Sequence, residues 1–154
     1  MNLTLVCVGK LKERHWRDAA DEYLKRLRPY ARVSVIEVLD RDVTADEARA
    51  LAAEGEGIVR AIPEGSRVVV LDIVGAARSS ADLAAWLERH GVEGTSAITF
   101  VVGGASGLDG RVLDRADERL SLGPLTLPHQ LARVVLLEQL YRAFRIMRGE
   151  PYHR

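Results

Sequence analysis

The stretch AITFVVGG, residues 97–104, decides the fold: six apolar or β-branched residues run without a charge into two glycines. A short, continuous apolar run of this kind is typical of a strand buried on both faces of a parallel sheet. Two further stretches have the same character, RVVVLDI at residues 67–73 and LTLVCV at residues 3–8, which stops at Gly9. Together they predict the centre of a parallel sheet.

Segments with helical spacing of apolar residues alternate with these strands. A capping box at Thr44–Glu47 and a cap at Ser79 or Ser80 mark helix starts, and Pro29 marks a helix end. The predicted helices span residues 15–27, 48–62, 80–90, 108–118 and 129–147, and two further strands span residues 33–38 and 120–122. The alternation predicts an α/β fold, a mostly parallel sheet flanked by helices, and we expect a single domain over residues 1–154.

The composition is that of a globular protein, with 47% hydrophobic and 29% charged residues in 154. No apolar run approaches the ~20 residues that span a membrane, and residues 1–10 lack the features of a signal peptide. Cys7 is the only cysteine, which excludes an internal disulfide and predicts a reducing, cytoplasmic location. Its place in a strand pattern predicts a buried, inert thiol.

Charge is balanced overall but uneven along the chain. A formal net charge of zero argues against a protein that coats nucleic acid through bulk charge. Residues 10–32 carry eight Lys/Arg against four Asp/Glu, residues 37–64 carry three against eight, and residues 133–154 carry five Arg against two Glu. The basic segments either hold phosphates locally or are solvated helix faces.

Three segments follow predicted strands, where open parallel sheets bind their ligands: residues 71–75, 102–107 and 122–127. Gly103 and Gly104 allow a ligand to approach the backbone, since no Cβ intervenes. Their surroundings match neither the dinucleotide fingerprint, nor a phosphate loop, nor a nucleophile elbow. The glycine pair therefore marks either a tight turn or a cofactor site of another kind.

The segment LGPLTLPH, residues 122–129, is apolar and contains two prolines, so it fits neither a helix nor a central strand. Either it wraps a flat, partly apolar group such as an adenine ring, or it forms a buried crossover.

The last predicted helix, residues 129–147, is apolar on most of its sides. Such a helix must be buried on more than one side, which in a chain of this size predicts a homodimer interface. Arg142, Arg145 and Arg148 are three residues apart and therefore neighbours on the helix. Glu138 and Arg142 form an i,i+4 pair, for which the plain interpretation is a surface ion pair.

The chain ends in RGEPYHR, residues 148–154. Tyr152 can stack on an unpaired base, His153 titrates near neutrality, and Arg154 can hold a phosphate. The alternative is a tail without function. No metal site is predicted, because the four histidines are scattered and no cysteine stands at zinc-ligand spacing.

Several short sequence blocks, when they occur together at this spacing, are specific to one protein family. They are Val6–Lys10, Leu71–Ile73 with Gly75, Val102–Gly104 with Gly107 and Leu108, Leu120–Leu122, Leu125–His129, Arg133, Glu138–Ala143 and Pro151–His153. In these blocks the chain resembles, over its whole length, the SPOUT-class methyltransferases, and among them the RlmH family of 23S rRNA pseudouridine-N3-methyltransferases.

The resemblance implies an α/β-knot fold with a C-terminal trefoil knot, a homodimer, and S-adenosylmethionine as cofactor. The cofactor contacts that it implies are Leu71, Gly103, Leu122, Gly123, Pro124, Leu125, Thr126 and Leu127. The implied reaction is methylation of N3 of a pseudouridine, of the position 1915 type, in the 23S rRNA of the assembled ribosome. The RNA site is expected to draw on both subunits, and neither a membrane nor a metal is expected.

Methyl transfer to N3 requires loss of a proton, so a general base or a cation that stabilises the anion would help. We expect His153 to contact the substrate or remove the proton, Arg142 to stabilise the anion, and Tyr152 to stack on the flipped base. Arg145, Arg148 and Arg154 are expected to hold phosphates.

Three alternatives remain at this stage. A different SPOUT activity such as tRNA methylation is disfavoured, because such enzymes often carry an extra RNA-binding domain. A non-catalytic ribosome-binding factor would not need an intact cofactor loop. A nicotinamide-dependent oxidoreductase lacks its fingerprint here.

Overall fold

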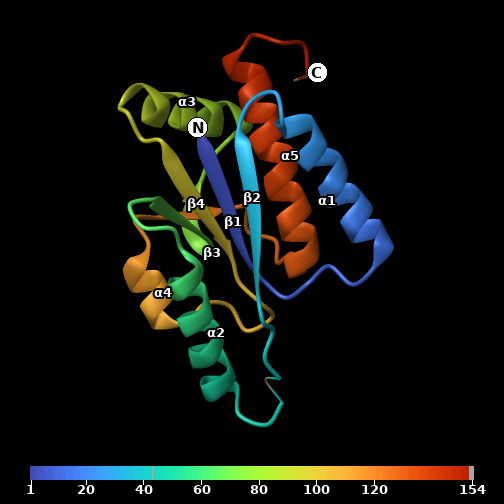
Figure 1. The fold of residues 1–154 in the computed structure, drawn as a ribbon, viewed down its shortest axis with the longest axis vertical. Coiled ribbons are helices and arrows are strands. Elements are labelled where there is room, and N and C mark those ends of the chain that lie inside the picture. The colour runs from blue at the N-terminus through green and yellow to red at the C-terminus, as the bar shows by residue number, and fades with distance from the viewer. Residues whose placement is uncertain (43, 153–154) are drawn as a thin grey trace.

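The computed structural model describes residues 1–42 and 44–152 and contains one five-stranded sheet with the order β2-β1-β4-β3-β5 (Figure 1). The strands are β1 (Asn2–Val8), β2 (Arg32–Val38), β3 (Arg67–Ala77), β4 (Ala97–Val102) and β5 (Glu118–Ser121). Every pairing between these strands is parallel, which confirms the predicted α/β class.

Helices cover both faces of the sheet (Figure 1). They are α1 (Arg14–Leu27), α2 (Glu47–Ala61), α3 (Ser80–Val92), α4 (Gly110–Arg115) and α5 (His129–Met147). The helices α1, α3 and α5 pack on one face, and α2 and α4 pack on the other. The trefoil knot stays a prediction.

The side chains of β1 explain why two cores form. Leu3, Leu5 and Cys7 belong to the core under α1, α3 and α5, and Val6 and Val8 belong to the core under α2 and α4. Each of the five is at most 1% exposed. Successive side chains of a strand point to opposite faces, so a run that is apolar throughout fits a strand covered on both sides. The predicted burial of Cys7 is confirmed.

Two helix boundaries differ from the sequence-based prediction. Thr44 does not cap α2: its hydroxyl donates to Asp42 at 2.6 Å, and Asp46 is the N-cap, accepting from the Arg49 N–H at 3.0 Å. The helix predicted over residues 108–118 is shorter, because Asp109 caps the start of α4 and Ala116, whose backbone is extended, ends it. The N–H of Asp117 then donates to the Val68 carbonyl of β3 at 2.9 Å.

The strand predicted over residues 67–73 continues to Ala77, with an excursion that the sequence did not reveal. Leu71 and Ala76 both pair with Leu120, so residues 72–75 leave the ladder with β5. Gly75 permits the close approach, since a Cβ there would lie 2.7 Å from the carbonyl carbon of Arg119. The predicted strand at residues 120–122 is β5, which begins two residues earlier and ends one residue earlier.

The helix α5 lies between α1 and α3 (Figure 1), and its buried residues join their core. The helices α1 and α3 of the same chain thus cover apolar sides of α5 that the sequence analysis expected a second subunit to cover. Some apolar side chains of α5, including Val134 and Val135, are only half-buried. The homodimer therefore stays a prediction, and the burial of α5 on two sides no longer requires it.

Glu118 on β5 gathers several donors. Its carboxylate accepts hydrogen bonds from Arg67 at 2.7 Å, Arg78 at 2.7 Å and Trp86 at 2.9 Å. Burial acts to raise the pKa of Glu118, but the hydrogen bonds from Arg67 and Trp86 oppose it, and the pKa lies below its ordinary value. The network ties β3 and α3 to the edge strand.

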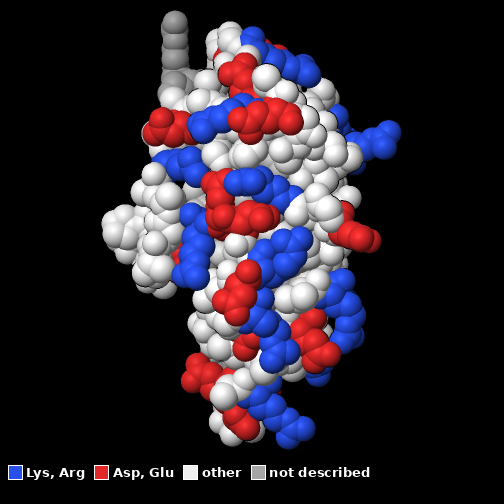
Figure 2. Space-filling model, turned by 90° about the vertical axis from the view of Figure 1, so that its left-hand side faces the viewer, with Lys and Arg blue, Asp and Glu red and all other residues white. Residues whose placement is uncertain are grey.

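Charged side chains of both signs are interspersed on the face shown in Figure 2, with no broad field of one sign. This fits the formal net charge of zero. Within the described residues, none of the helices is both long and apolar enough to cross a bilayer.

Candidate cofactor cavity and active site

A cavity of about 810 Å³ opens at the carboxyl ends of β3 and β4. It is lined by the excursion of β3, the glycine turn after β4 and the loop before α5. A hollow of about 160 Å³ shares Leu71, Asp72, Thr126 and Leu127 with it, and we call the two together the strand-end cavity. Its position is the one expected for a ligand of an open parallel sheet.

The turn after β4 brings backbone to the rim of this cavity. Gly107 has a φ of +83°, and its N–H donates to the Gly104 carbonyl at 3.2 Å. A Cβ on Gly103 would lie 2.8 Å from the Gly107 carbonyl oxygen, so a side chain there would force the turn apart. The glycine pair forms a tight turn and also lines the cavity, so the two interpretations of the sequence are compatible.

The loop before α5 is held at its start by Ser121. The Ser121 hydroxyl accepts from the Gly123 N–H at 3.1 Å and donates to the Gly123 carbonyl at 3.2 Å. Gly123 has a φ of +118°, a conformation that side chains rarely adopt. Further along the loop, Leu125 lines the cavity and is still 78% exposed. The loop therefore presents an apolar side chain that the described residues leave largely uncovered.

The walls of the strand-end cavity are mostly apolar. Its polar side chains are Asp72, Thr126 and His129, and no Lys or Arg is among the described residues that line it. The Asp72 carboxylate lies 3.4 Å from Arg119 and accepts the Val74 N–H at 3.2 Å. The cavity thus offers a carboxylate but no cationic side chain.

The cavity brings together seven of the eight residues predicted to contact the cofactor. They are Leu71, Gly103, Leu122, Gly123, Leu125, Thr126 and Leu127. Pro124 is exposed and does not line it.

Asp72 and His129 also line the cavity, although neither was among the predicted cofactor contacts. Both stand in segments that the sequence marked as possible ligand sites, residues 71–75 and 122–129. The sequence therefore indicated their segments but not their side chains.

The predicted catalytic residues Arg142 and Tyr152 lie together at the other end of α5. Arg142 donates to one oxygen of Glu138 at 2.6 and 2.9 Å, and its guanidinium carbon lies 4.8 Å from the centre of the Tyr152 ring. The Tyr152 hydroxyl donates to the same Glu138 oxygen at 3.3 Å. Tyr152 also packs edge-on against Tyr141, with ring centres 4.8 Å apart. We call Arg142, Tyr152, Glu138 and Tyr141 the tail cluster.

The surroundings of the tail cluster set its protonation states. Burial raises the pKa of Tyr152 to about 12, with a contribution from its hydrogen bond to Tyr23. The hydrogen bond to Glu138 raises the pKa of Arg142 further above its ordinary value. Both shifts move the pKa away from 7, so Tyr152 keeps its ordinary neutral state and Arg142 its ordinary charge at neutral pH.

The predicted phosphate-binding arginines are placed differently from one another. Arg145 is half-buried, 2.7 Å from Glu150 and donating to Tyr141 at 3.0 Å. Arg148 is exposed, with its guanidinium carbon 4.5 Å from the centre of the Tyr30 ring. Arg154 and His153 lie outside the described residues.

The tail cluster and the strand-end cavity are separate within one chain. Ala132 lines the cavity, and Arg142 follows it by ten residues on the same helix. At a rise of about 1.5 Å per residue, the two positions are about 15 Å apart along the helix axis. Among the described residues, no group of His, Cys, Asp and Glu side chains has an arrangement that could hold a metal ion.

Comparison with known sequences places these observations in a family. A family model described as "Predicted SPOUT methyltransferase" matches residues 1–153. The chain is 47% identical to "Ribosomal RNA large subunit methyltransferase H" of Carboxydothermus hydrogenoformans over 159 residues, covering all of both chains. It is 50% identical, with the same coverage, to the protein of that name from Bifidobacterium animalis subsp. lactis.

Solved structures show the same fold. A probable methylase family protein from Haemophilus influenzae matches with a TM-score of 0.59 and 15% identity, over 99% of this chain and 70% of that one. A probable methyltransferase from Bordetella pertussis matches with a TM-score of 0.57 and 13% identity, over 92% of this chain and 95% of that one. The chain belongs to the SPOUT family of methyltransferases.

Proposed function

We propose that this chain, acting as one SPOUT domain over residues 1–154, transfers a methyl group from S-adenosylmethionine to N3 of a pseudouridine in 23S rRNA. Its substrate is the assembled ribosome in the cytoplasm, and its active form is a homodimer. The curated relatives named for methylation of large-subunit ribosomal RNA support the substrate class.

The lining of the strand-end cavity is the observation that carries the cofactor assignment. S-adenosylmethionine has a positive sulfonium, an ammonium group and no phosphate, whereas a nicotinamide dinucleotide carries two negative phosphates. A cavity with the Asp72 carboxylate and no described lining Lys or Arg suits the former. The larger part of the cavity, about 810 Å³, is within the ~300–1,000 Å³ common for such ligands.

Individual residues have separate parts in holding the cofactor. The bare backbone at Gly103 leaves room for close approach, and Leu125 and Leu127 supply apolar surface for the adenine ring. Asp72 is placed to accept hydrogen bonds from ribose hydroxyls or the ammonium group. When bound, the cofactor supplies an electrophilic methyl group on a positively charged sulfur.

The tail cluster supplies the substrate side of the reaction. The Tyr152 ring stacks on the extruded base, and the Arg142 cation stabilises the negative charge that develops when N3 loses its proton. His153 takes up that proton, and Arg145, Arg148 and Arg154 contact phosphates. The new bond joins N3 to the methyl carbon, while the electrons of the broken carbon–sulfur bond stay on sulfur.

Reacting atoms must approach to about 3–3.5 Å. Because the tail cluster and the strand-end cavity of one chain are about 15 Å apart along α5, they cannot act on the same atoms. The tail cluster of one subunit acts at the strand-end cavity of the other. The homodimer is therefore part of the proposal for a catalytic reason, independent of any apolar surface.

Calorimetric titration of the purified protein tests the cofactor assignment. S-adenosylmethionine is expected to bind saturably, and NADH, at the same concentration, is expected to give no signal. Saturable NADH binding without an S-adenosylmethionine signal would contradict the proposed function.

A further inference from the structure

A second cavity, of about 340 Å³, lies on the other side of the first turns of α5. Its walls come from the segment after β1, from α1, from β2 and from α5. Lys10, Arg17 and Asp21 stand at its rim, and Leu24, Val35 and Leu137 are part of its apolar wall. The volume is within the range of about 300–1,000 Å³ typical of small-molecule sites.

Arg133 is the buried polar group of this cavity. The residue is 3% exposed, and its terminal nitrogens donate to Glu37 at 2.9 Å and to the Gly9 carbonyl at 2.7 Å. Its Nε is buried and has no hydrogen-bond partner within residues 1–42 and 44–152. A buried donor without an acceptor costs about 1–3 kcal/mol, so the Arg133 side chain gains if it turns its Nε toward the cavity and a ligand there supplies the acceptor.

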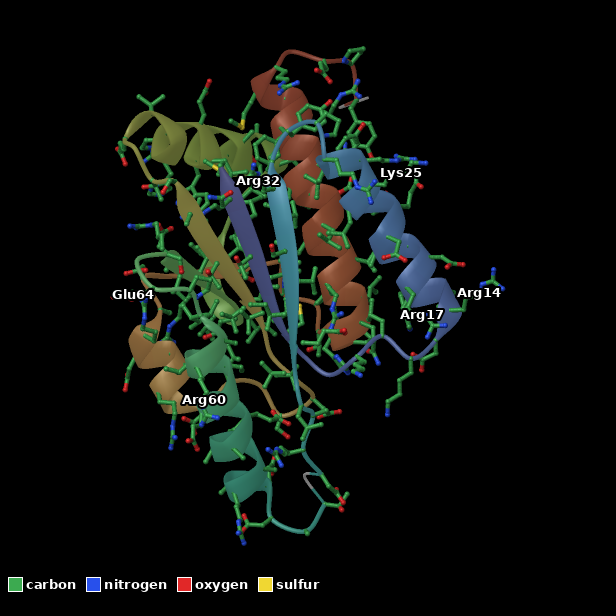
Figure 3. All side chains as sticks on the ribbon, in the orientation of Figure 1. Arg14, Arg17, Lys25, Arg32, Arg60 and Glu64 are labelled. Atoms are coloured by element: carbon green, nitrogen blue, oxygen red, sulfur yellow. The ribbon has the colours of Figure 1, made fainter. Side chains whose placement is uncertain are left out.

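Charge and shape narrow the ligand further. The side chain of Arg17 lies on α1 beside the cavity, whereas Arg14, one turn earlier, points away from the molecule (Figure 3). The cavity is lined by three cations, Lys10, Arg17 and Arg133, and by two carboxylates, Asp21 and Glu37. Its lining therefore has a net positive charge. The ligand therefore combines an apolar body, an acceptor for Arg133 and a negative group for the rim.

We infer that this cavity binds a second, unpaired nucleotide of the RNA substrate, with the base against the apolar wall and the phosphate between Lys10 and Arg17. A carbonyl oxygen of the base then accepts from Arg133 Nε, as single-stranded RNA is bound by apolar surface and cations together. This inference rests on the proposed function for its ligand class. Ala132 lines the cofactor cavity and Arg133 this one, so the second nucleotide is close to the target base in the fold.

The test is a titration of ¹⁵N-labelled protein, saturated with S-adenosylmethionine, with uridine 5′-monophosphate, followed by NMR. The Arg133 Nε–H resonance and the amides of Leu11 and Val35 are expected to shift together. Lys10→Ala combined with Arg17→Ala is expected to weaken binding at least tenfold. The matched control, Arg14→Ala combined with Lys25→Ala, removes two exposed cations of α1 that do not line the cavity and should not change it (Figure 3).

Any one of three results would overturn the inference. Uridine 5′-monophosphate could compete with S-adenosylmethionine, inorganic phosphate could bind as tightly as the nucleotide, or the Lys10→Ala/Arg17→Ala variant could bind the nucleotide as tightly as the wild-type protein. On ribosomes, the same variant should raise KM and leave kcat and the cofactor Kd unchanged. Failure of the wild-type protein to methylate ribosomes, with nucleotide binding intact, would instead contradict the proposed function.

Discussion

At the scale of single residues, environment decides what each polar group can do. Burial raises the pKa of the Cys7 thiol to about 11, and burial with the Tyr23 contact raises that of Tyr152 to about 12. The single cysteine was predictable as inert from its strand pattern. The raised pKa of Tyr152 was not predictable, because it depends on neighbours from α1 and α5.

Cys7 is expected to resist thiol reagents while the protein is folded. With a pKa of about 11, about one thiol in a thousand is ionised at pH 8, and the side chain is 1% exposed. Reaction with Ellman's reagent should be slow in buffer and complete in guanidinium chloride. Rapid, stoichiometric reaction of the native protein would show that β1 is not covered on both faces.

Glu118→Gln is expected to lower the free energy of unfolding by about 2 kcal/mol, because the partly buried donors of Arg67, Arg78 and Trp86 lose a charged acceptor. Since the folded-state pKa of Glu118 lies below its usual value, the stabilisation is present above the unfolded pKa and is lost as pH falls through the folded one. Denaturant titrations at pH 7 and pH 3 measure both effects.

Glu56→Gln is the matched control, since its ion pair with Arg60 is exposed. It should leave stability unchanged at either pH. Equal effects of the two substitutions at pH 7 would mean that the Glu118 network contributes nothing.

At the scale of elements, the central strands were predictable because a short, continuous apolar run is typical of a strand that is buried on both faces of a sheet. The limits of β3 and α4 were not predictable, since tertiary contacts set them. Pairing with β5 lengthens β3 around the excursion at residues 72–75, and Asp117 bonds to Val68 of β3 directly after the end of α4. The cap at Thr44 was wrong because Asp42 accepts from the Thr44 N–H and Asp46, two residues later, accepts from the Arg49 N–H and caps the helix instead. Most of the cavity residues were predictable, because they belong to the segments 71–75, 102–107 and 122–129 that follow predicted strands.

The glycine turn after β4 is expected to control cofactor affinity. Gly103→Ala places a Cβ 2.8 Å from the Gly107 carbonyl oxygen, so the turn must shift, and the Kd for S-adenosylmethionine should rise at least tenfold. Gly110→Ala is the control, because a Cβ there meets nothing within 4 Å. Calorimetry on both variants provides the measurement, and a Gly103→Ala protein with unchanged Kd would exclude the turn from the cofactor site.

At the scale of the whole molecule, one chain holds both halves of the proposed active site too far apart to meet. The separation follows from the length of α5, which places Ala132 beside the cavity and Arg142 beside Tyr152. Sequence motifs identified both halves but contain no information on the distance between them. The proposed homodimer would bring the tail cluster of one subunit to the cavity of the other.

Mixing Gly103→Ala and Arg142→Ala subunits, assayed at an S-adenosylmethionine concentration too low for the Gly103→Ala cavity to bind, tests that arrangement. Gly103→Ala subunits have intact tail clusters, and Arg142→Ala subunits have intact cavities. After exchange, each mixed dimer holds one complete site if the tail acts on its partner, and about a quarter of wild-type activity should return. A mixture as inactive as its parents, although subunit exchange occurs, would contradict a site shared between subunits.

The most direct test of the account is mass spectrometry of nucleosides from ribosomes that lack the modification, incubated with the purified protein and S-adenosylmethionine. We expect N3-methylpseudouridine in 23S rRNA, dependent on the cofactor and strongly reduced with Gly103→Ala at a cofactor concentration near the wild-type Kd. Methyl groups on another RNA or another atom, or no product despite cofactor binding, would contradict the proposed function.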